Sequence, residues 1–473
     1  QPEIGDLLPV YVYDDYPGWR VKTFLGLSEW EFENYVSKNV AALRTVLDHS
    51  GATVAVTNHA VPGPEIARRA LSGTGTAYAS IIHGSSLQYV ARQSDFYMQI
   101  ARRGLSEATK VIALSYHSAG TVAEYFPELD KRTVALPGGV DTGRFRPDAL
   151  DIRVTSSLVG GPGRGTGEVE RLREILDRFS DRGSTEDLAG ELKAVSSRYE
   201  PRCHDADAGE RLRSLISGDA PVILYVGKLI HSKGFHCLLS AFARVRREEP
   251  ETRLLIIGYG TLREGLEALA LALSAGNRRV VELLARGGRL FEGGPASEME
   301  HFTLSETLLR DAKGMAEAIE FVGPLYHAEL ARLLPAGEVA VVPSIFPETF
   351  GLVAAEAAAS SVPPFVADHS GLREAGAIVG RGLPVDLRVG LKGDFGENLA
   401  RALVDYLSLP KEERQGCRET VRRNSVEYLS WDALARQIAT LAGGTRRPSD
   451  PPRRSQGYGS MYPQTQKRAS SLP

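Results

Sequence analysis

Short apolar runs alternate with helix-like stretches along most of the 473-residue chain, and this alternation restricts the possible folds more than any other feature. Continuous apolar strands that are joined by helices are typical of a parallel sheet covered by helices on both faces. Residues 1–150 show this pattern, so we predict that they form a doubly wound α/β domain. The expected strands of this domain are residues 10–13, 52–57, 79–83, 110–114 and 133–136.

The alternation restarts at Pro221 and predicts a second doubly wound domain over residues 220–425. Within it, residues 272–317 form a long, charged, helix-like stretch that we interpret as an insertion. Two such domains place a ligand cleft between the carboxyl ends of their sheets, which suits a nucleotide-bearing substrate on one domain and a second substrate on the other. The expected strands of the second domain are residues 222–227, 253–258, 320–322, 339–342 and 362–366.

The remaining segments have a different composition. Residues 151–219 contain a glycine-rich stretch at 160–167, and we interpret them as a flexible insertion or linker. Residues 426–442 are expected to form a C-terminal helix. Residues 443–473 are rich in Pro, Ser and Gly with an excess of basic side chains, so we expect them to be disordered. Because the chain begins with Gln1, we also expect the first domain to be truncated at its start.

Charge and cysteine content restrict the class of protein. The 56 Lys and Arg residues are balanced by 59 Asp and Glu, which argues against a dedicated nucleic-acid binder. Three widely spaced cysteines argue against a disulfide framework or a cysteine zinc site and favour a reducing compartment. No apolar run approaches the roughly 18 residues that a spanning helix needs, and no secretory signal is found. We therefore expect a cytoplasmic protein with no nucleic-acid partner and no transmembrane segment.

The most informative motif is residues 343–356, which follow an expected strand and open a helix of small residues. A helix start offers unpaired N–H groups and a partial positive charge, which suit anions and sugar hydroxyls. Glu348 stands at the edge of the loop, and Glu356 lies about two turns further along on roughly the same face. One carboxylate could meet a transferred group while the other accepts hydrogen bonds from two ribose hydroxyls. Taken alone, the pair could also be a solvated helix face with Glu348 as a cap.

A second motif, residues 226–234, leaves the first expected strand of the second domain. Its Lys228 and Lys233 lie in a loop bounded by Gly227 and Gly234, where two cations could hold a diphosphate and neutralise the charge on a leaving group. On spacing alone, two solvated loop lysines are an equal alternative.

A histidine follows an expected strand in the first domain. His83 stands beside Gly84 at the carboxyl edge of the sheet, where it could bind a sugar hydroxyl, although a structural histidine fits the sequence equally well. By contrast, residues 258–260 give only a weak dinucleotide-binding signal, because the third glycine of that fingerprint is missing.

Together these motifs resemble the retaining glycosyltransferases of family 4, the glycosyl transferases group 1, which have the GT-B fold. The family pattern of Gly-Arg-Leu, three residues and Lys-Gly is similar to residues 227–234, with Lys228 in place of arginine. The family's pair of glutamates separated by seven residues matches Glu348 and Glu356. The Gly-rich loop that usually follows the first strand of the family is not found, so the resemblance covers most of residues 52–147 and 220–442.

The resemblance implies transfer of a sugar from a nucleoside-diphosphate sugar to an acceptor hydroxyl, with retained anomeric configuration. It also implies two facing Rossmann-like domains, a C-terminal helix that crosses back to the first domain, and no bound metal or cofactor. The acceptor would be a carbohydrate, a lipid or a small molecule. The implied catalytic residues are Glu348, His83 and Lys233. The implied donor-binding residues are Gly227, Lys228, Lys233, Phe350, Gly351, Leu352, Val353 and Glu356, of which Glu356 would hold the ribose.

Two other functions fit the same motifs. One is a nucleotide-sugar epimerase or hydrolase of the same architecture, and the other is a non-catalytic protein that binds a sugar nucleotide. A dehydrogenase is disfavoured, because no complete glycine fingerprint follows a first strand. The motifs leave the donor base, the donor sugar and the acceptor open.

Overall fold

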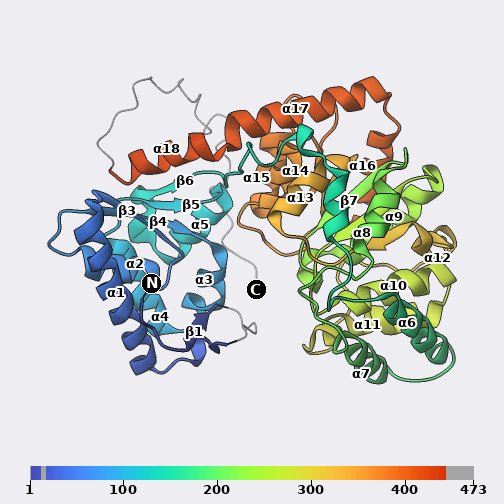
Figure 1. Ribbon diagram of the computed structural model, residues 1–473, viewed down its shortest axis with the longest axis horizontal. Coiled ribbons are helices and arrows are strands. Elements are labelled where there is room, and N and C mark those ends of the chain that lie inside the picture. The colour runs from blue at the N-terminus through green and yellow to red at the C-terminus, as the bar shows by residue number, and fades with distance from the viewer. Residues whose placement is uncertain (1, 12–17, 444–473) are drawn as a thin grey trace.

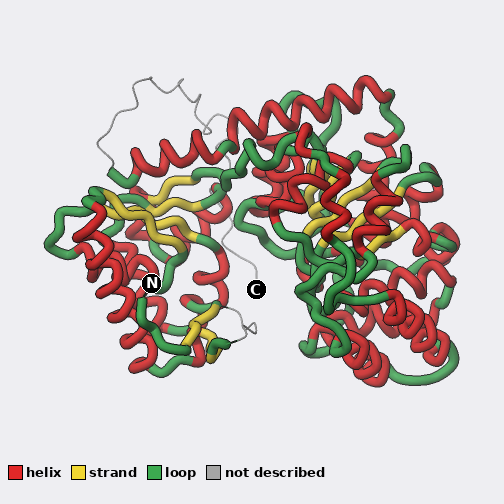
Figure 2. The backbone as a smooth tube through the Cα atoms, in the orientation of Figure 1, coloured by secondary structure: helices red, strands yellow, loops and turns green. Residues whose placement is uncertain are grey.

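The computed structural model describes residues 2–11 and 18–443, which form two α/β units side by side, each with a sheet at its centre (Figures 1 and 2). Half of the predicted strand at 10–13 and the predicted tail after Gly443 lie outside the described residues. We call the unit that contains the first sheet the first domain and the other the second domain.

The first domain contains a parallel sheet with the strand order β3-β4-β5-β6. Its strands are β3 (Val54–Asn58), β4 (Ala77–Ile82), β5 (Val111–Ala113) and β6 (Thr133–Ala135). The helices around it are α1 (Glu29–Ser50), α2 (Gly63–Leu71), α3 (Gly84–Tyr89), α4 (Asp95–Ser106) and α5 (Tyr116–Tyr125). The alternation of apolar and helical stretches therefore gives the expected doubly wound arrangement.

The start of the first domain differs from the expectation. The first strand is β1 (Leu7–Val10), earlier than residues 10–13, and it pairs in parallel with β2 (Arg20–Thr23) in a separate two-stranded sheet. The apolar pattern predicts that a strand forms near these residues. It does not show which other strand pairs with it.

The second domain has a six-stranded parallel sheet with the order β12-β11-β10-β7-β8-β9. Its strands are β7 (Val222–Val226), β8 (Arg253–Ile257), β9 (Ile319–Phe321), β10 (Val339–Val342), β11 (Pro364–Ala367) and β12 (Arg388–Val389). The helices that follow these strands are α9 (Phe235–Glu248), α10 (Arg263–Ala275), α13 (His327–Leu333), α14 (Leu352–Ala359), α15 (Ser370–Val379) and α16 (Phe395–Leu407). The carboxyl ends of parallel strands meet at one edge, so the loops after them are neighbours.

Residues 151–219 are helical, and the prediction of a flexible linker is wrong for most of this segment. It contains α6 (Thr166–Phe179), α7 (Thr185–Ser196) and α8 (Ala208–Ile216). Leu172 and Leu188 are fully buried and belong to the same core cluster as the second sheet. The glycine-rich stretch is a turn before α6, and the amphipathic pattern after it packs helices onto the domain.

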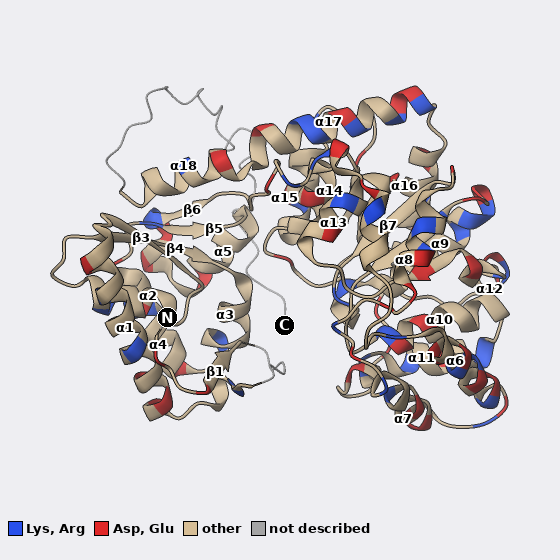
Figure 3. Ribbon diagram, in the orientation of Figure 1, with Lys and Arg blue, Asp and Glu red and all other residues tan. Residues whose placement is uncertain are grey.

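The predicted insertion at 272–317 joins the same helical layer. It contains the end of α10, then α11 (Arg278–Gly287) and α12 (Glu306–Asp311). Helices α6 and α7 contact α10 and α11, and the four lie together beside the second sheet (Figure 1). Basic and acidic residues alternate along the helices of this layer (Figure 3). Two segments that are far apart in the sequence thus form one layer.

The last helices connect the domains. Helix α17 (Lys411–Leu429) lies along the second domain and α18 (Trp431–Leu441) along the first (Figure 1). Between them, the N–H of Val140 donates to the carbonyl of Leu429, and the N–H of Trp431 donates to the carbonyl of Val140. No helix among the described residues is long and apolar enough to cross a bilayer.

The packing of α7 predicts a large effect of one substitution. Leu188→Ala should lower the free energy of unfolding by about 2–5 kcal/mol, because it opens a cavity in a fully buried contact. The control is Val159→Ala in the same segment, where the side chain is 67% exposed, and it should change stability little. Urea unfolding measures both variants. Equal stability of the two would contradict the packing of α7 into the core.

Candidate active site

The loop after β7 reaches the loop after β10 through a contact that needs glycine. Gly234 has φ +65°, and a Cβ at this position would lie 2.0 Å from the carbonyl oxygen of Pro343. The N–H of Ile345 also donates to the carbonyl of Ser232, with N and O 3.0 Å apart. This close packing sets Lys233 beside Glu348. Lys228, five residues earlier, is exposed.

Lys233 and Glu348 form an ion pair across these two loops. The hydroxyl of buried Ser344 donates to the same oxygen of Glu348, with the oxygens 2.8 Å apart. This ion pair joins Glu348, the catalytic candidate of the first motif, to Lys233, a diphosphate-binding candidate of the second motif. The structure thus brings together two residues that lie 115 positions apart in the sequence.

A chain of hydrogen bonds through Ser370 and His369 holds the backbone of Glu348 in place. The N–H of Glu348 donates to the Ser370 hydroxyl at 2.9 Å, and the ring of His369 lies 2.6 Å from the carbonyl oxygen of Ser344. Because a carbonyl only accepts, Nε2 of His369 carries a proton, and Nδ1 lies 3.0 Å from the hydroxyl oxygen of Ser370. Ser370 has φ +48°, a strained conformation for a residue with a side chain.

Sequence reasoning missed Ser344, His369 and Ser370. The last two follow β11 directly, so they lie at the same sheet edge as the predicted loops. A polar Asp-His-Ser-Gly run after an apolar strand was the signal that could have identified them.

The loop into α14 contains four predicted donor-binding residues. Gly351 has φ +105°, and a Cβ there would lie 2.5 Å from the side chain of Leu372. The Phe350 ring is buried and packs against Gly138 of the first domain, whereas the Leu352 side chain is exposed. Val353 is half-buried in the first turn of the helix. The backbone of this turn, rather than the Phe350 ring, is therefore the part that could contact a ligand.

Glu356 lies in α14, five residues after Gly351, and its side chain is largely buried. Burial raises the pKa of its carboxyl to about 7. Nε2 of His327, at the start of α13, lies 3.9 Å from a carboxylate oxygen of Glu356. A buried carboxyl of this kind would be stabilised in its ionised form by a ligand that donates hydrogen bonds to it.

His83 lies in the first domain at the end of β4. Its Nε2 is 3.0 Å from the side-chain oxygen of Asn58, and its ring centroid is 4.7 Å from that of His59. Burial lowers the pKa of His83, and burial together with His83 lowers the pKa of His59 to about 4, so both rings favour the neutral form. Asn58 and His59 are contacts that sequence reasoning did not assign to the site.

The two domains meet directly beside these groups. A Cβ on Gly84, next to His83, would lie 2.8 Å from the side chain of Thr349, which follows Glu348. The hydroxyl of Ser118 donates to the carbonyl of Thr349 at 3.3 Å. A small pocket at this junction is lined by Ile82, Gly84, Leu87, Gln88, His117, Ser118, Thr121, Pro347, Glu348 and Thr349. Glu348 thus borders this interdomain pocket from the second domain, and Gly84, the neighbour of His83 in the chain, borders it from the first.

A carboxylate of the second domain also reaches the first. The Glu374 side chain on α15 accepts hydrogen bonds from the N–H groups of Tyr116 and His117 at the start of α5, at 2.8 and 2.9 Å. The helix start provides a favourable field for a carboxylate, while burial raises the pKa of Glu374. Glu374 therefore links the domains at the edge of the pocket.

At one edge of the second sheet, this arrangement combines two lysines, two glutamates and the N–H groups at the start of α14. The neutral imidazoles of His59 and His83 belong to the first domain. Lysines and N–H groups suit a phosphorylated ligand, and the carboxylates suit hydroxyl groups. Within the described part of the chain, no group of three or more His, Cys, Asp or Glu residues is placed to hold a metal ion.

The buried carboxyl predicts a pH-dependent stability. The folded-state pKa of Glu356, about 7, lies above its ordinary value of 4.5, so ionisation destabilises the fold. This cost is absent below about pH 4.5, grows as the pH rises towards 7, and is complete above it, at roughly 3 kcal/mol. Glu356→Gln should therefore be more stable than the wild type at pH 8 but not at pH 4.5, as measured by urea unfolding.

The control for this comparison is Glu298→Gln, which changes an exposed loop carboxylate. It should shift unfolding equally at the two pH values. The same difference between Glu356→Gln and the wild type at pH 4.5 and pH 8 would contradict the raised pKa.

Comparison with known protein families gives a match within the second domain. Residues 209–282 and 303–424 match the family Glycosyl transferases group 1, and the matched ranges include Lys233, Glu348 and Glu356. The interruption between the two ranges, residues 283–302, begins within α11 and lies in the predicted insertion at 272–317.

Curated relatives match only parts of the chain. A glycogen synthase of Mycobacterium tuberculosis is 34% identical over 153 residues, which is 32% of this chain and 27% of the relative. A D-inositol 3-phosphate glycosyltransferase of Kribbella flavida is 28% identical over 298 residues, which is 59% of each protein. The chain therefore spans less than two thirds of the length of these relatives.

Solved structures match nearly the whole chain in fold. Sucrose-phosphate synthase from Thermosynechococcus elongatus has a TM-score of 0.51 and 19% identity, over 91% of this chain and 84% of that one. Anabaena HepE, solved in complex with UDP and glucose, has a TM-score of 0.50 and 15% identity, over 92% and 90%. These matches confirm the predicted α/β fold of two facing Rossmann-like domains.

Proposed function

We propose that this protein transfers a sugar from a nucleoside-diphosphate sugar to an acceptor hydroxyl, with retention of anomeric configuration. The observation that carries the proposal is the Lys233–Glu348 pair beside the helix start at Gly351, at the interdomain pocket. This constellation falls inside the segments that match Glycosyl transferases group 1. The family match and the shared fold support the reaction class, and the chemistry of the site supports the assignment of residues.

In this proposal the positive charge of the site holds the donor diphosphate. Lys233 is already paired with the Glu348 carboxylate, so on binding it would exchange this anionic partner for the diphosphate. Lys228 adds a second cation. The N–H groups of residues 350–353 face the same ligand from the helix start. Two lysines and a helix start then stabilise the charge that develops on the leaving phosphate, with no resident metal or cofactor.

The two carboxylates divide the recognition of the sugar and the nucleoside. Glu356 is buried and would accept hydrogen bonds from the two ribose hydroxyls, which favours its ionised form. Glu348, held by Ser344 and Ser370, contacts the transferred sugar. His83, neutral and oriented by Asn58, meets the same sugar from the first domain.

The transfer itself needs no protein nucleophile. The bond between the anomeric carbon and the phosphate oxygen breaks, and the acceptor oxygen forms the new bond from the same face. The acceptor proton passes to the departing phosphate oxygen. The protein contributes orientation and charge stabilisation to this step.

Nucleotide binding provides the first test. Calorimetric titration with UDP, GDP, ADP and NAD should show binding of one nucleoside diphosphate, and Glu356→Ala should weaken it by about 5- to 150-fold, since it removes hydrogen bonds to the ribose. Glu298→Ala, in an exposed loop, is the matched control and should bind as the wild type does. Binding of none of the four ligands, or unchanged affinity in Glu356→Ala, would contradict the proposal.

The role of Lys233 is tested by turnover. With the donor whose nucleotide binds, Lys233→Ala should slow release of nucleoside diphosphate by roughly a hundredfold, because charge on the leaving group is less stabilised. Lys313→Ala, which changes an exposed lysine of the same domain, should leave the rate unchanged.

Slow transfer to water then reports the stereochemistry. The sugar first released should have the anomeric configuration of the donor, as followed by proton NMR. Release of the opposite anomer would exclude retention, and a wild-type rate in Lys233→Ala would exclude its role at the diphosphate.

A further inference from the structure

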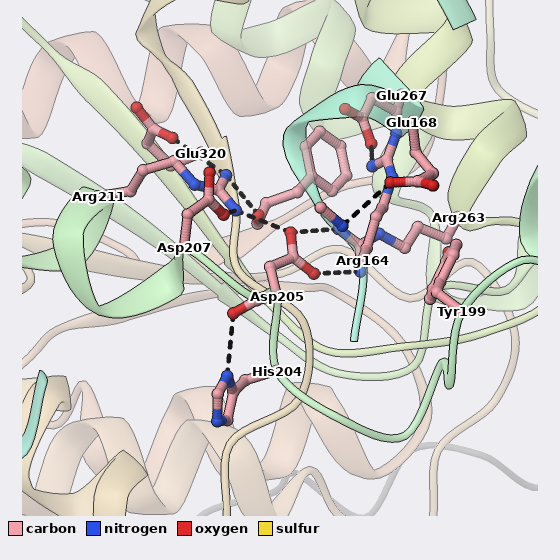
Figure 4. A network of polar contacts seen from close by, with 12 residues as sticks. Arg164, Glu168, Tyr199, His204, Asp205, Asp207, Arg211, Arg263, Glu267 and Glu320 are labelled. Carbon is pink, nitrogen blue, oxygen red and sulfur yellow. Dashed lines mark hydrogen bonds and ion pairs between the residues drawn. The ribbon is translucent and has the colours of Figure 1, made fainter. Parts of the chain in front are cut away.

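A buried network of charged side chains fixes the segment 203–207, which leads from the inserted helices to α8, against the second sheet (Figure 4). The Asp205 carboxylate accepts two hydrogen bonds from Arg263, both 2.7 Å long, and one from Arg211 at 2.8 Å. The side chains of Asp205 and Arg263 are 4% and 2% exposed. Breaking a buried pair of this kind is strongly unfavourable, so the segment has one well-defined position.

The same segment is bound to the end of β9 through its backbone. The N–H of Asp205 donates to the carbonyl of Val322 at 3.0 Å, and Arg211 donates to the carbonyl of Phe321 at 2.7 Å. Gly323 follows with φ +75°, and a Cβ there would lie 3.0 Å from backbone atoms of Cys203, His204 and Asp205. The segment from the insertion therefore lies directly against the loop that follows β9.

His204 is the member of this segment whose side chain turns away from the charged network (Figure 4). Its Nδ1 lies 2.9 Å from the carbonyl oxygen of Asp205. A carbonyl only accepts, so Nδ1 carries the proton, and Nε2 of the neutral ring is a hydrogen-bond acceptor. The network and the backbone contacts thus hold an acceptor of defined orientation beside Gly323.

The loop after β9 connects this position to the candidate nucleotide site. The N–H of Gly258 donates to the carbonyl of Gly323 at 2.9 Å, and a Cβ on Gly258 would lie 1.8 Å from the carbonyl oxygen of Gly227. These three glycines form a continuous floor at the carboxyl ends of β7, β8 and β9. From Gly323 the chain runs four residues to His327, whose Nε2 is 3.9 Å from Glu356.

We propose that His204 contacts the base of the donor nucleotide and contributes to its selection. The inference depends on the proposed function, in which Glu356 holds the ribose and the lysines hold the diphosphate. A base attached to that ribose, on the side away from the phosphates, lies along residues 323–326 and reaches the edge occupied by His204. Nε2 accepts a hydrogen bond from an N–H group at the edge of the base. The inserted segment is then a wall of the donor pocket.

The experiment measures base discrimination rather than overall affinity. The wild type, His204→Ala and His204→Gln are titrated with UDP, GDP, ADP and CDP, and with inorganic pyrophosphate as a probe that has no base. His204→Ala should bind the preferred nucleotide up to about tenfold more weakly, because one hydrogen bond is lost, while its pyrophosphate affinity is unchanged. His204→Gln keeps an acceptor and should restore part of the preference.

His49→Ala serves as the matched control. His49 lies at the exposed end of α1, with its Nδ1 2.7 Å from the carbonyl oxygen of Thr45, the same kind of local contact that His204 makes. It should leave every affinity unchanged. Thermal unfolding of all variants reports whether the fold is intact.

The possible outcomes separate this inference from the proposed function. Unchanged base preference in His204→Ala, with binding that is still lost in Glu356→Ala, would overturn the role of His204 and leave the transferase proposal intact. Equal weakening of all nucleotides and of pyrophosphate would show a structural role and would also overturn it. Absence of nucleotide binding in the wild type would instead overturn the proposed function, and the contact to the base with it.

Discussion

The site depends on close backbone contact between loops that leave one edge of the second sheet. Gly234 lies against Pro343, Gly258 against Gly227, and a Cβ on Gly371 would lie 2.3 Å from the carbonyl oxygen of Thr349. At these distances no side chain fits between the loops, so the strand ends form a continuous surface of peptide groups. The side chains that a ligand would contact stand on this surface, and their positions follow from the sheet rather than from flexible loops.

Electrostatic strain is concentrated at the same edge. Lys233 and Glu348 neutralise one another, whereas Glu356 is buried, with its pKa raised to about 7. The neutral pair means that the loops can pack closely without a ligand, and the destabilised carboxyl gains the most from a ligand that donates hydrogen bonds. A buried, poorly compensated carboxyl lowers stability, and ionisable groups with shifted pKa values are concentrated at functional sites.

The sequence predicted those parts of the fold and the site that are local in the chain. Alternating apolar runs located the two parallel sheets, and the motif containing Glu348 also predicted the helix start at Gly351. Residues 151–219 were mistaken for a linker because glycines at 160–167 dominate the pattern, while the buried partners of Leu188 lie elsewhere in the chain. Hydrogen bonds such as Glu348 to Ser370 depend on chain segments that only the folded sheet brings together.

The contacts between the two domains are of two kinds. At one side the domains are joined by backbone hydrogen bonds around Val140 and by Arg422, which donates to carbonyls of both domains. At the pocket, the link is polar and solvent can replace it, because Glu374 bonds to two N–H groups and Ser118 to one carbonyl. Separating the domains there exchanges hydrogen bonds with protein for hydrogen bonds with water, a change that costs little. The connection at α17 and α18 is made by the backbone and by buried side chains, so the two sides of the domain contact differ in how readily water can replace them.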